Sequence, residues 1–114
     1  MKFNSFEEIL AYQKSEQLAL KIYTLLRDCN DFGFKNQIQR AVVSISNNIA
    51  EGFERKGNKE FRQFLFIAKG SCGEVRSMLR LSLKLNYVSE GNFNVLHNLS
   101  VEVSKMLSGL IKKL

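Results

Sequence analysis

Proline is absent from the 114 residues, although average usage would give about five or six. Proline interrupts helices because it lacks a backbone N–H and its ring clashes with the preceding turn. Its absence suits long helices joined by short turns, and suits a β-sandwich poorly. The chain also lacks any apolar run approaching the ~20 residues of a membrane span, so we expect no membrane association.

Cysteine and histidine are scarce. The two cysteines, Cys29 and Cys72, lie in distant segments, and His97 is the single histidine. The three residues do not have the spacing of a metal site, and we expect no metal, no other cofactor and no small-molecule substrate. An N-terminus unlike a signal peptide and two isolated cysteines favour the reducing cytoplasm.

Acidic residues are too few to balance the basic ones. Lysine and arginine number 17 against 11 aspartates and glutamates, a net charge of +6. The excess is concentrated in residues 61–90, which hold five basic and two acidic residues. A basic surface favours polyanions such as RNA or DNA, although many basic proteins bind none. The length fits a single domain over residues 1–114.

Apolar residues recur at three- and four-residue steps through four segments, the period of amphipathic helices. Ser5 and Glu8 have the spacing of a capping box, and Asn58 is placed to cap the third helix. Short connections predict an all-α fold, an up-down four-helix bundle. The predicted helices cover residues 6–28, 36–56, 59–85 and 90–113.

One edge of the second predicted helix is polar along its length. At ~100° per residue these polar side chains stack beside an apolar face. Side chains of the third helix are candidates for a shared hydrogen-bond network, in which Arg40 is the expected partner of Glu74. This polar network comprises Arg40, Ser44, Asn48, Glu51, Ser71 and Glu74.

Glu51 and Glu74 have an alternative interpretation as paired acid and base carboxylates. No nucleophile, metal-ligand set or phosphate loop accompanies them. We therefore favour the structural role and expect that the protein is not an enzyme. Gly70 and Gly73 lie inside the third predicted helix, without the strand–turn–helix context of a phosphate loop. We expect these glycines to permit close approach of another helix.

The third predicted helix has more apolar surface than one bundle needs. A stripe a little over ~100° wide is enough for a core face. Phe66 lies outside both the core face and the additional apolar surface beside it. Surplus apolar surface is typical of subunit interfaces, so we predict a homo-oligomer. The additional apolar strip consists of Ile67, Met78, Leu81 and Leu85, with Glu74 among them.

The same helix carries a column of cations within about 80° of its circumference, in an arc that contains no acidic residue. At ~1.5 Å per residue the column is roughly 33 Å long, enough to follow several phosphates. The basic column comprises Arg62, Lys69, Arg76, Arg80 and Lys84, and its extension in the preceding loop comprises Arg55, Lys56 and Lys59.

Three interpretations of the basic column remain open. It binds the phosphates of RNA or DNA, it docks an acidic protein on an oligomeric scaffold, or it is a solvated face that keeps the protein soluble. We favour a non-enzymatic nucleic-acid-binding protein. Tyr12, Tyr23 and Tyr87 are not interleaved with the column, which argues against base-specific reading.

The run from Gln37 to Val75 reads QIQRAVVSISNNIAEGFERKGNKEFRQFLFIAKGSCGEV. It resembles the core signature of the 23S rRNA intervening sequence proteins, small bacterial four-helix bundles often encoded within an insertion in a ribosomal RNA gene. Family members usually have proline where Ser46 stands. The matching positions include Gln37, Arg40, Ser44, residues 48–52, residues 59–61, Phe64, Ala68, Gly70, Ser71 and Glu74.

More remotely, the family is similar to the accessory variability protein of diversity-generating retroelements. That relative is a basic, homopentameric barrel that associates with reverse transcriptase and nucleic acid. The resemblance therefore implies a ring-like homo-oligomer, a pentamer, with RNA as a partner.

Overall fold

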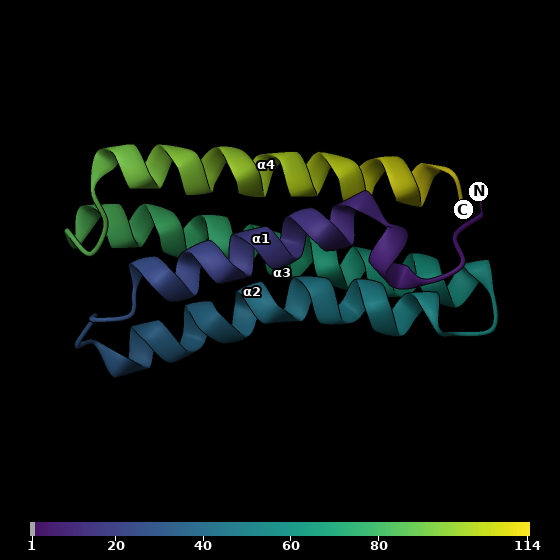
Figure 1. The fold of residues 1–114 in the computed structure, drawn as a ribbon, viewed down its shortest axis with the longest axis horizontal. Helices are drawn as coiled ribbons and strands as arrows, with labels where there is room; N and C mark the ends of the chain where they lie inside the picture. The colour runs from purple at the N-terminus through teal and green to yellow at the C-terminus, as the bar shows by residue number, and fades with distance from the viewer. Residues whose placement is uncertain (1) are drawn as a thin grey trace.

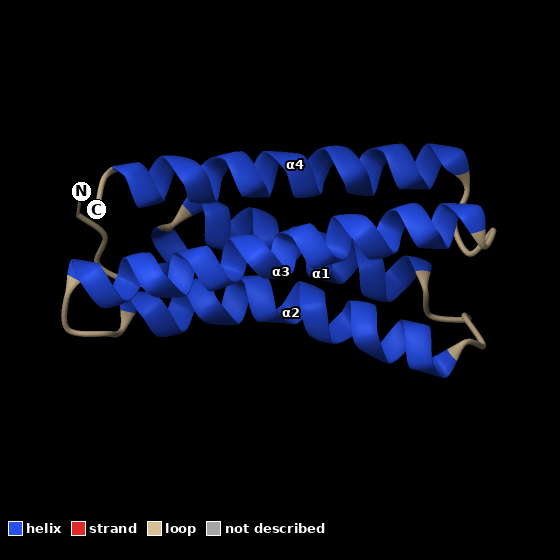
Figure 2. Ribbon diagram, turned by 180° about the vertical axis from the view of Figure 1, so that it is seen from behind, coloured by secondary structure: helices blue, strands red, loops and turns tan. Residues whose placement is uncertain are grey.

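The computed structural model describes residues 2–114 and contains four long α-helices. No strand occurs in this described part of the chain (Figure 2), which confirms the all-α prediction. A short 3-10 helix, η1, spans Phe6–Glu8 and precedes the first long helix. The long helices are α1 (Leu10–Leu25), α2 (Phe32–Phe53), α3 (Asn58–Lys84) and α4 (Glu90–Lys112).

The four helices lie side by side in a bundle with extents of 43 × 22 × 19 Å (Figure 1). Helix α2 packs against α1 and α3, and α4 packs against α3 and α1. Within residues 2–114, α1 does not approach α3 closely, and α2 does not approach α4. The α2–α3 connection lies at the same end as both termini, and the other two connections lie at the opposite end (Figure 1). The predicted four-helix bundle is confirmed.

The core contains the apolar positions that the helical period predicted. Leu18, Ile45, Leu65 and Val103, one from each helix, are fully buried. Complete burial of a leucine or isoleucine side chain contributes roughly 1.5–3 kcal/mol. Helix α2 is rich in serine, asparagine and glycine, which are weak helix formers. Its apolar face, rather than intrinsic propensity, therefore stabilises this helix.

The start of the chain differs from the predicted capping box. Ser5 makes no side-chain cap bond, and the Glu8 carboxylate instead accepts from the backbone N–H of Asn4 at 3.1 Å. Ile9 is extended, with φ −76° and ψ 120°, so the chain turns between η1 and α1. The first predicted helix is thus a short 3-10 turn followed by a separate α-helix.

Two other helix starts also differ from expectation. Helix α2 begins at Phe32 rather than residue 36, because the Asp31 side chain accepts from the backbone N–H of Phe34 at 3.2 Å. Asn58 is the first residue of α3 rather than its cap. Gly57 occupies the N-cap position and supplies no side-chain bond.

Candidate functional site

The polar network lies along a groove of about 1050 Å³ on α2. All six predicted members line this groove, so the structure brings them together as the helical spacing indicated. Most of the lining comes from α2, whereas α1 contributes Tyr23 and α3 contributes Ser71 and Glu74. Asn36, Gln37, Gln39 and Asn47 add further amide groups.

A hydrogen-bonded chain joins α2 to α3 within the groove. The hydroxyls of Ser44 and Ser71 lie 2.9 Å apart. The Asn48 amide donates to the Ser44 hydroxyl at 2.9 Å and to the Ser44 carbonyl at 2.8 Å. Ser44 can therefore accept from Asn48 and donate to Ser71 at once, since a hydroxyl has one donor and two lone pairs. This contact is half-buried and links the two helices.

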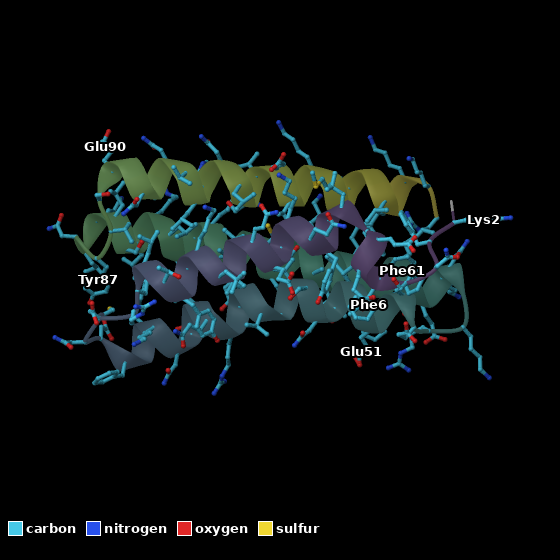
Figure 3. The ribbon with its side chains drawn as sticks, viewed as in Figure 1. Lys2, Phe6, Glu51, Phe61, Tyr87 and Glu90 are labelled. Carbon is cyan, nitrogen blue, oxygen red and sulfur yellow. The ribbon has the colours of Figure 1, made fainter. Side chains whose placement is uncertain are left out.

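The carboxylates of the network have partners other than those expected. Glu74 accepts from the amide of Gln37 at 3.5 Å, and Arg40 makes no ion pair within residues 2–114. The predicted Arg40–Glu74 pair is therefore wrong for a single protomer. Glu74 is also exposed in the protomer. Glu51 lies at the outer edge of the bundle (Figure 3) and pairs with Arg55 at 3.6 Å.

The basic column approaches α4 at Arg76. Arg76 donates to the sulfur of Cys72 at 3.8 Å, and the Cys72 thiol donates to the carbonyl of Ser100 in α4 at 3.1 Å. Lys69 and Arg76 are half-buried. Arg62, Arg80 and Lys84 are exposed, and within residues 2–114 none of these five cations pairs with a carboxylate.

The extension of the column is uneven. Arg55 lies 3.6 Å from Glu51 and 4.0 Å from Glu60, and its guanidinium is 5.0 Å from the ring centre of Phe64. Two carboxylates therefore already balance this arginine. Lys56 and Lys59 are exposed, and they form no ion pair within the described chain.

The extra apolar strip of α3 is exposed in the protomer, with one exception. Ile67 is 52% and Leu81 48% exposed, and Leu85 is also exposed. Met78 is only 7% exposed and packs in the core, so its assignment to the strip is wrong. Its place on the helix lies nearest the core face, and its long flexible side chain reaches inward.

The glycines of α3 do not have the predicted role. An added methyl carbon at Gly70 would meet no atom within 4 Å, and at Gly73 it would meet only the end of the Arg76 side chain at 3.9 Å. Close approach of α2 and α3 occurs instead at Gly52.

Sequence reasoning missed a contact at the end of the bundle away from the termini (Figure 3). The Tyr87 hydroxyl donates to Asp31 at 2.7 Å, and the Tyr87 ring packs edge-on against Phe34 at 5.2 Å. These hydrogen bonds from Tyr87 and the Phe34 backbone lower the pKa of Asp31, and the bond to Asp31 raises the pKa of Tyr87. The contact joins the loop before α2 to the loop before α4.

Two broader properties bear on function. Among residues 2–114, no helix is both long and apolar enough to cross a membrane. No group of three or more histidine, cysteine, aspartate or glutamate side chains in this part of the chain could hold a metal ion.

Comparison with known proteins gives the family. Residues 7–109 match the 23S rRNA-intervening sequence proteins. The chain belongs to this family. The structure is also similar to a crystal structure from Bacteroides thetaiotaomicron, of a protein with unknown function from the S23 ribosomal protein family. That similarity has 28% sequence identity and a TM-score of 0.85, and covers 90% of this chain and 99% of the other. No curated protein matches the chain.

Proposed function

We propose that this member of the 23S rRNA-intervening sequence protein family is a non-enzymatic protein that binds the phosphate backbone of RNA or DNA. The binding surface is the basic column of α3. The names of its family and of its structural relative, which refer to ribosomal RNA and to a ribosomal protein, agree with RNA as the ligand.

The observation that carries the proposal is that no carboxylate among residues 2–114 forms an ion pair with the five cations of the column. Ordinary exposed faces mix charges of both signs. Arg55, in the loop before α3, shows the contrast. It pairs with Glu51 and Glu60, whereas Arg62 in α3 pairs with neither. Cations without local partners remain available for phosphates, and the counterions condensed on the nucleic acid are released on binding.

The proposed assembly is a ring-like homo-oligomer of up-down bundles in the cytoplasm, and the remote resemblance favours a pentamer. The exposed strip of Ile67, Leu81 and Leu85 supplies apolar surface for contact between copies. A ring repeats the basic column on each subunit. Several weak phosphate contacts then act together through avidity.

The test is titration of a structured RNA at several salt concentrations. Backbone binding predicts that log affinity falls linearly with log salt, with a slope of about −0.7 to −0.9 per neutralised phosphate. The triple variant R62E/K69E/R76E should lose affinity and show a shallower slope. The matched control K21E/K105E/K113E changes the net charge equally, at exposed lysines outside α3 that form no ion pair within residues 2–114.

Equal RNA affinity of the parent and the α3 variant contradicts the proposal. Equal loss in both triple variants also contradicts it, because net charge alone then explains binding. An acidic protein is the competing ligand for the same column. Loss of polyglutamate binding with intact RNA binding in the α3 variant would assign the column to such a partner.

A further inference from the structure

Phe66 is a large aromatic side chain that the bundle core does not use. Its side chain is 50% exposed, on the outer surface of α3. At ~100° per residue it shares the arc of the basic column, between Arg62 one turn before and Lys69 one turn after. An aromatic ring interleaved with cations is the combination that proteins use to bind single-stranded nucleic acid.

The two sides of the Phe66 ring have different surroundings. On the N-terminal side, the Arg62 guanidinium lies over the ring, 5.5 Å from its centre. On the C-terminal side, the neighbour at the i+4 position is Gly70, which has no side chain. Even an added methyl carbon at Gly70 would meet nothing within 4 Å. The Phe66 ring therefore has a cation over it on the N-terminal side, and the position beside Gly70 on its C-terminal side is open.

This arrangement has the chemistry to accept a flat base. A nucleobase stacks on an aromatic ring whatever its identity, because every base has a π-face. Lys69 lies next to the open side along the helix, and Arg76 follows two turns later. A strand whose base stacks at Phe66 would keep its phosphates beside these cations. Bases within a duplex are paired and stacked on one another, so they are not available for this contact.

We propose that the basic column binds single-stranded nucleic acid, with Phe66 as the stacking platform for an unpaired base in the space beside Gly70. The inference rests on the proposed phosphate binding and adds the class of ligand. It changes the interpretation from the sequence, in which only tyrosines were considered as stacking residues. Recognition remains independent of base identity.

The experiment compares a fluorescently labelled single-stranded RNA of mixed sequence with a duplex of the same length, at one salt concentration. Phe66→Leu removes the aromatic ring but keeps an apolar side chain. It should weaken single-strand binding about tenfold, the typical effect of losing one base–aromatic stack, and leave duplex binding unchanged. A 2-aminopurine base in the strand reports stacking directly, because its fluorescence falls on binding to the parent and should fall less with the variant.

Gly70→Leu tests the open space without removing the ring. A leucine at i+4 packs against the Phe66 ring and fills the site. Leucine is also a better helix former than glycine, so this variant should fold at least as stably as the parent. Loss of single-strand affinity in a more stable protein cannot result from unfolding.

Phe32 provides a matched control. Its ring is 66% exposed, with the Lys35 ammonium 6.0 Å from the ring centre, but it lies at the start of α2. Phe32→Leu should leave both affinities unchanged. If it weakens binding as much as Phe66→Leu, exposed phenylalanines act non-specifically, and the inference is wrong.

Other outcomes separate this inference from the proposed function. If R62E/K69E/R76E loses RNA binding while Phe66→Leu and Gly70→Leu keep single-strand affinity, phosphate binding stands and the stacking site is wrong. If the triple charge variant also binds normally, both proposals fail. If Phe66→Leu changes the subunit number in light scattering, the ring lies between copies, which overturns its assignment as a base platform.

Discussion

Gly52 of α2 lies directly against Phe64 of α3. An added methyl carbon at Gly52 would stand 2.5 Å from the Cβ of Phe64 and 3.1 Å from the ring of Phe61. Neither obstacle is the flexible end of a long side chain, so the helices themselves would have to move apart. The absence of a side chain at this position permits the most extensive helix contact in the bundle.

We expect Gly52→Ala to lower the free energy of unfolding by about 1–3 kcal/mol, the usual cost of overpacking. This loss should appear even though alanine gains up to about 1 kcal/mol in helix propensity. Urea denaturation followed by circular dichroism measures the change. Gly70→Ala is the control, because it has the same propensity gain and open space around it. A G52A protein as stable as G70A would contradict the close contact.

The general architecture could be predicted from the sequence because burial imposes a helical period on apolar residues. Ile38, Ile45 and Ile49 of α2 are fully buried, as their spacing required. The six residues of the polar network line one groove for the same reason. Such predictions use only neighbours one turn apart, and local geometry determines these positions.

Contacts between helices depend on how neighbouring helices are placed against one another, and the sequence pattern does not contain this information. Tyr87 and Asp31 are separated by 56 positions, and no motif connects them. Glu74 meets Gln37 rather than Arg40, and the spacing within one helix does not show which side chain of the neighbouring helix it meets. Met78 reaches the core for a related reason, since a helical wheel does not show how far a flexible side chain can bend inward.

The hydroxyl pair of Ser44 and Ser71 predicts a measurable coupling between α2 and α3. Ser44→Ala should destabilise the protein by about 1 kcal/mol, because the half-buried Ser71 hydroxyl and the Asn48 amide lose a partner. Ser71→Ala should have a similar but smaller effect. In urea denaturation the double variant should lose less than the sum of the single variants. Strict additivity would show that the two hydroxyls do not interact.

The exposed apolar strip of α3 predicts that assembly depends on the side chains of Ile67 and Leu81. The parent should be oligomeric at micromolar concentration, and I67D/L81D should dissociate, because charges in an apolar interface are costly to desolvate. Multi-angle light scattering gives the subunit number. Leu20→Asp on α1 is the control, since Leu20 is 64% exposed but lies outside the strip. A monomeric parent, or equal dissociation of the control, would contradict the proposed interface.

The Asp31–Tyr87 bond predicts an acid-dependent contribution to stability. The pKa of the Asp31 carboxyl in the folded protein lies below the ordinary value of 3.8. Asp31 therefore binds a proton more weakly in the folded than in the unfolded protein. The contribution is therefore present above about pH 4 and is lost as the pH falls through the folded pKa. Tyr87→Phe removes the bond, so it should be less stable than the parent at pH 6, and this difference should shrink at pH 2–3. A constant difference would show that the loss has another cause.

The two cysteines predict a clear difference in thiol reactivity. Cys72 is fully buried, its thiol donates to the Ser100 carbonyl at 3.1 Å, and burial raises its pKa. Cys29 is only partly buried, in the turn after α1. Because the thiolate is the reactive species, Ellman's reagent at pH 8 should modify one thiol in the native protein and two in denaturant. Cys29→Ser should abolish the native reaction, and Cys72→Ser should leave it unchanged. Rapid reaction of native Cys72 would mean that α3 and α4 separate readily at this point, contrary to the packing seen around Ser100.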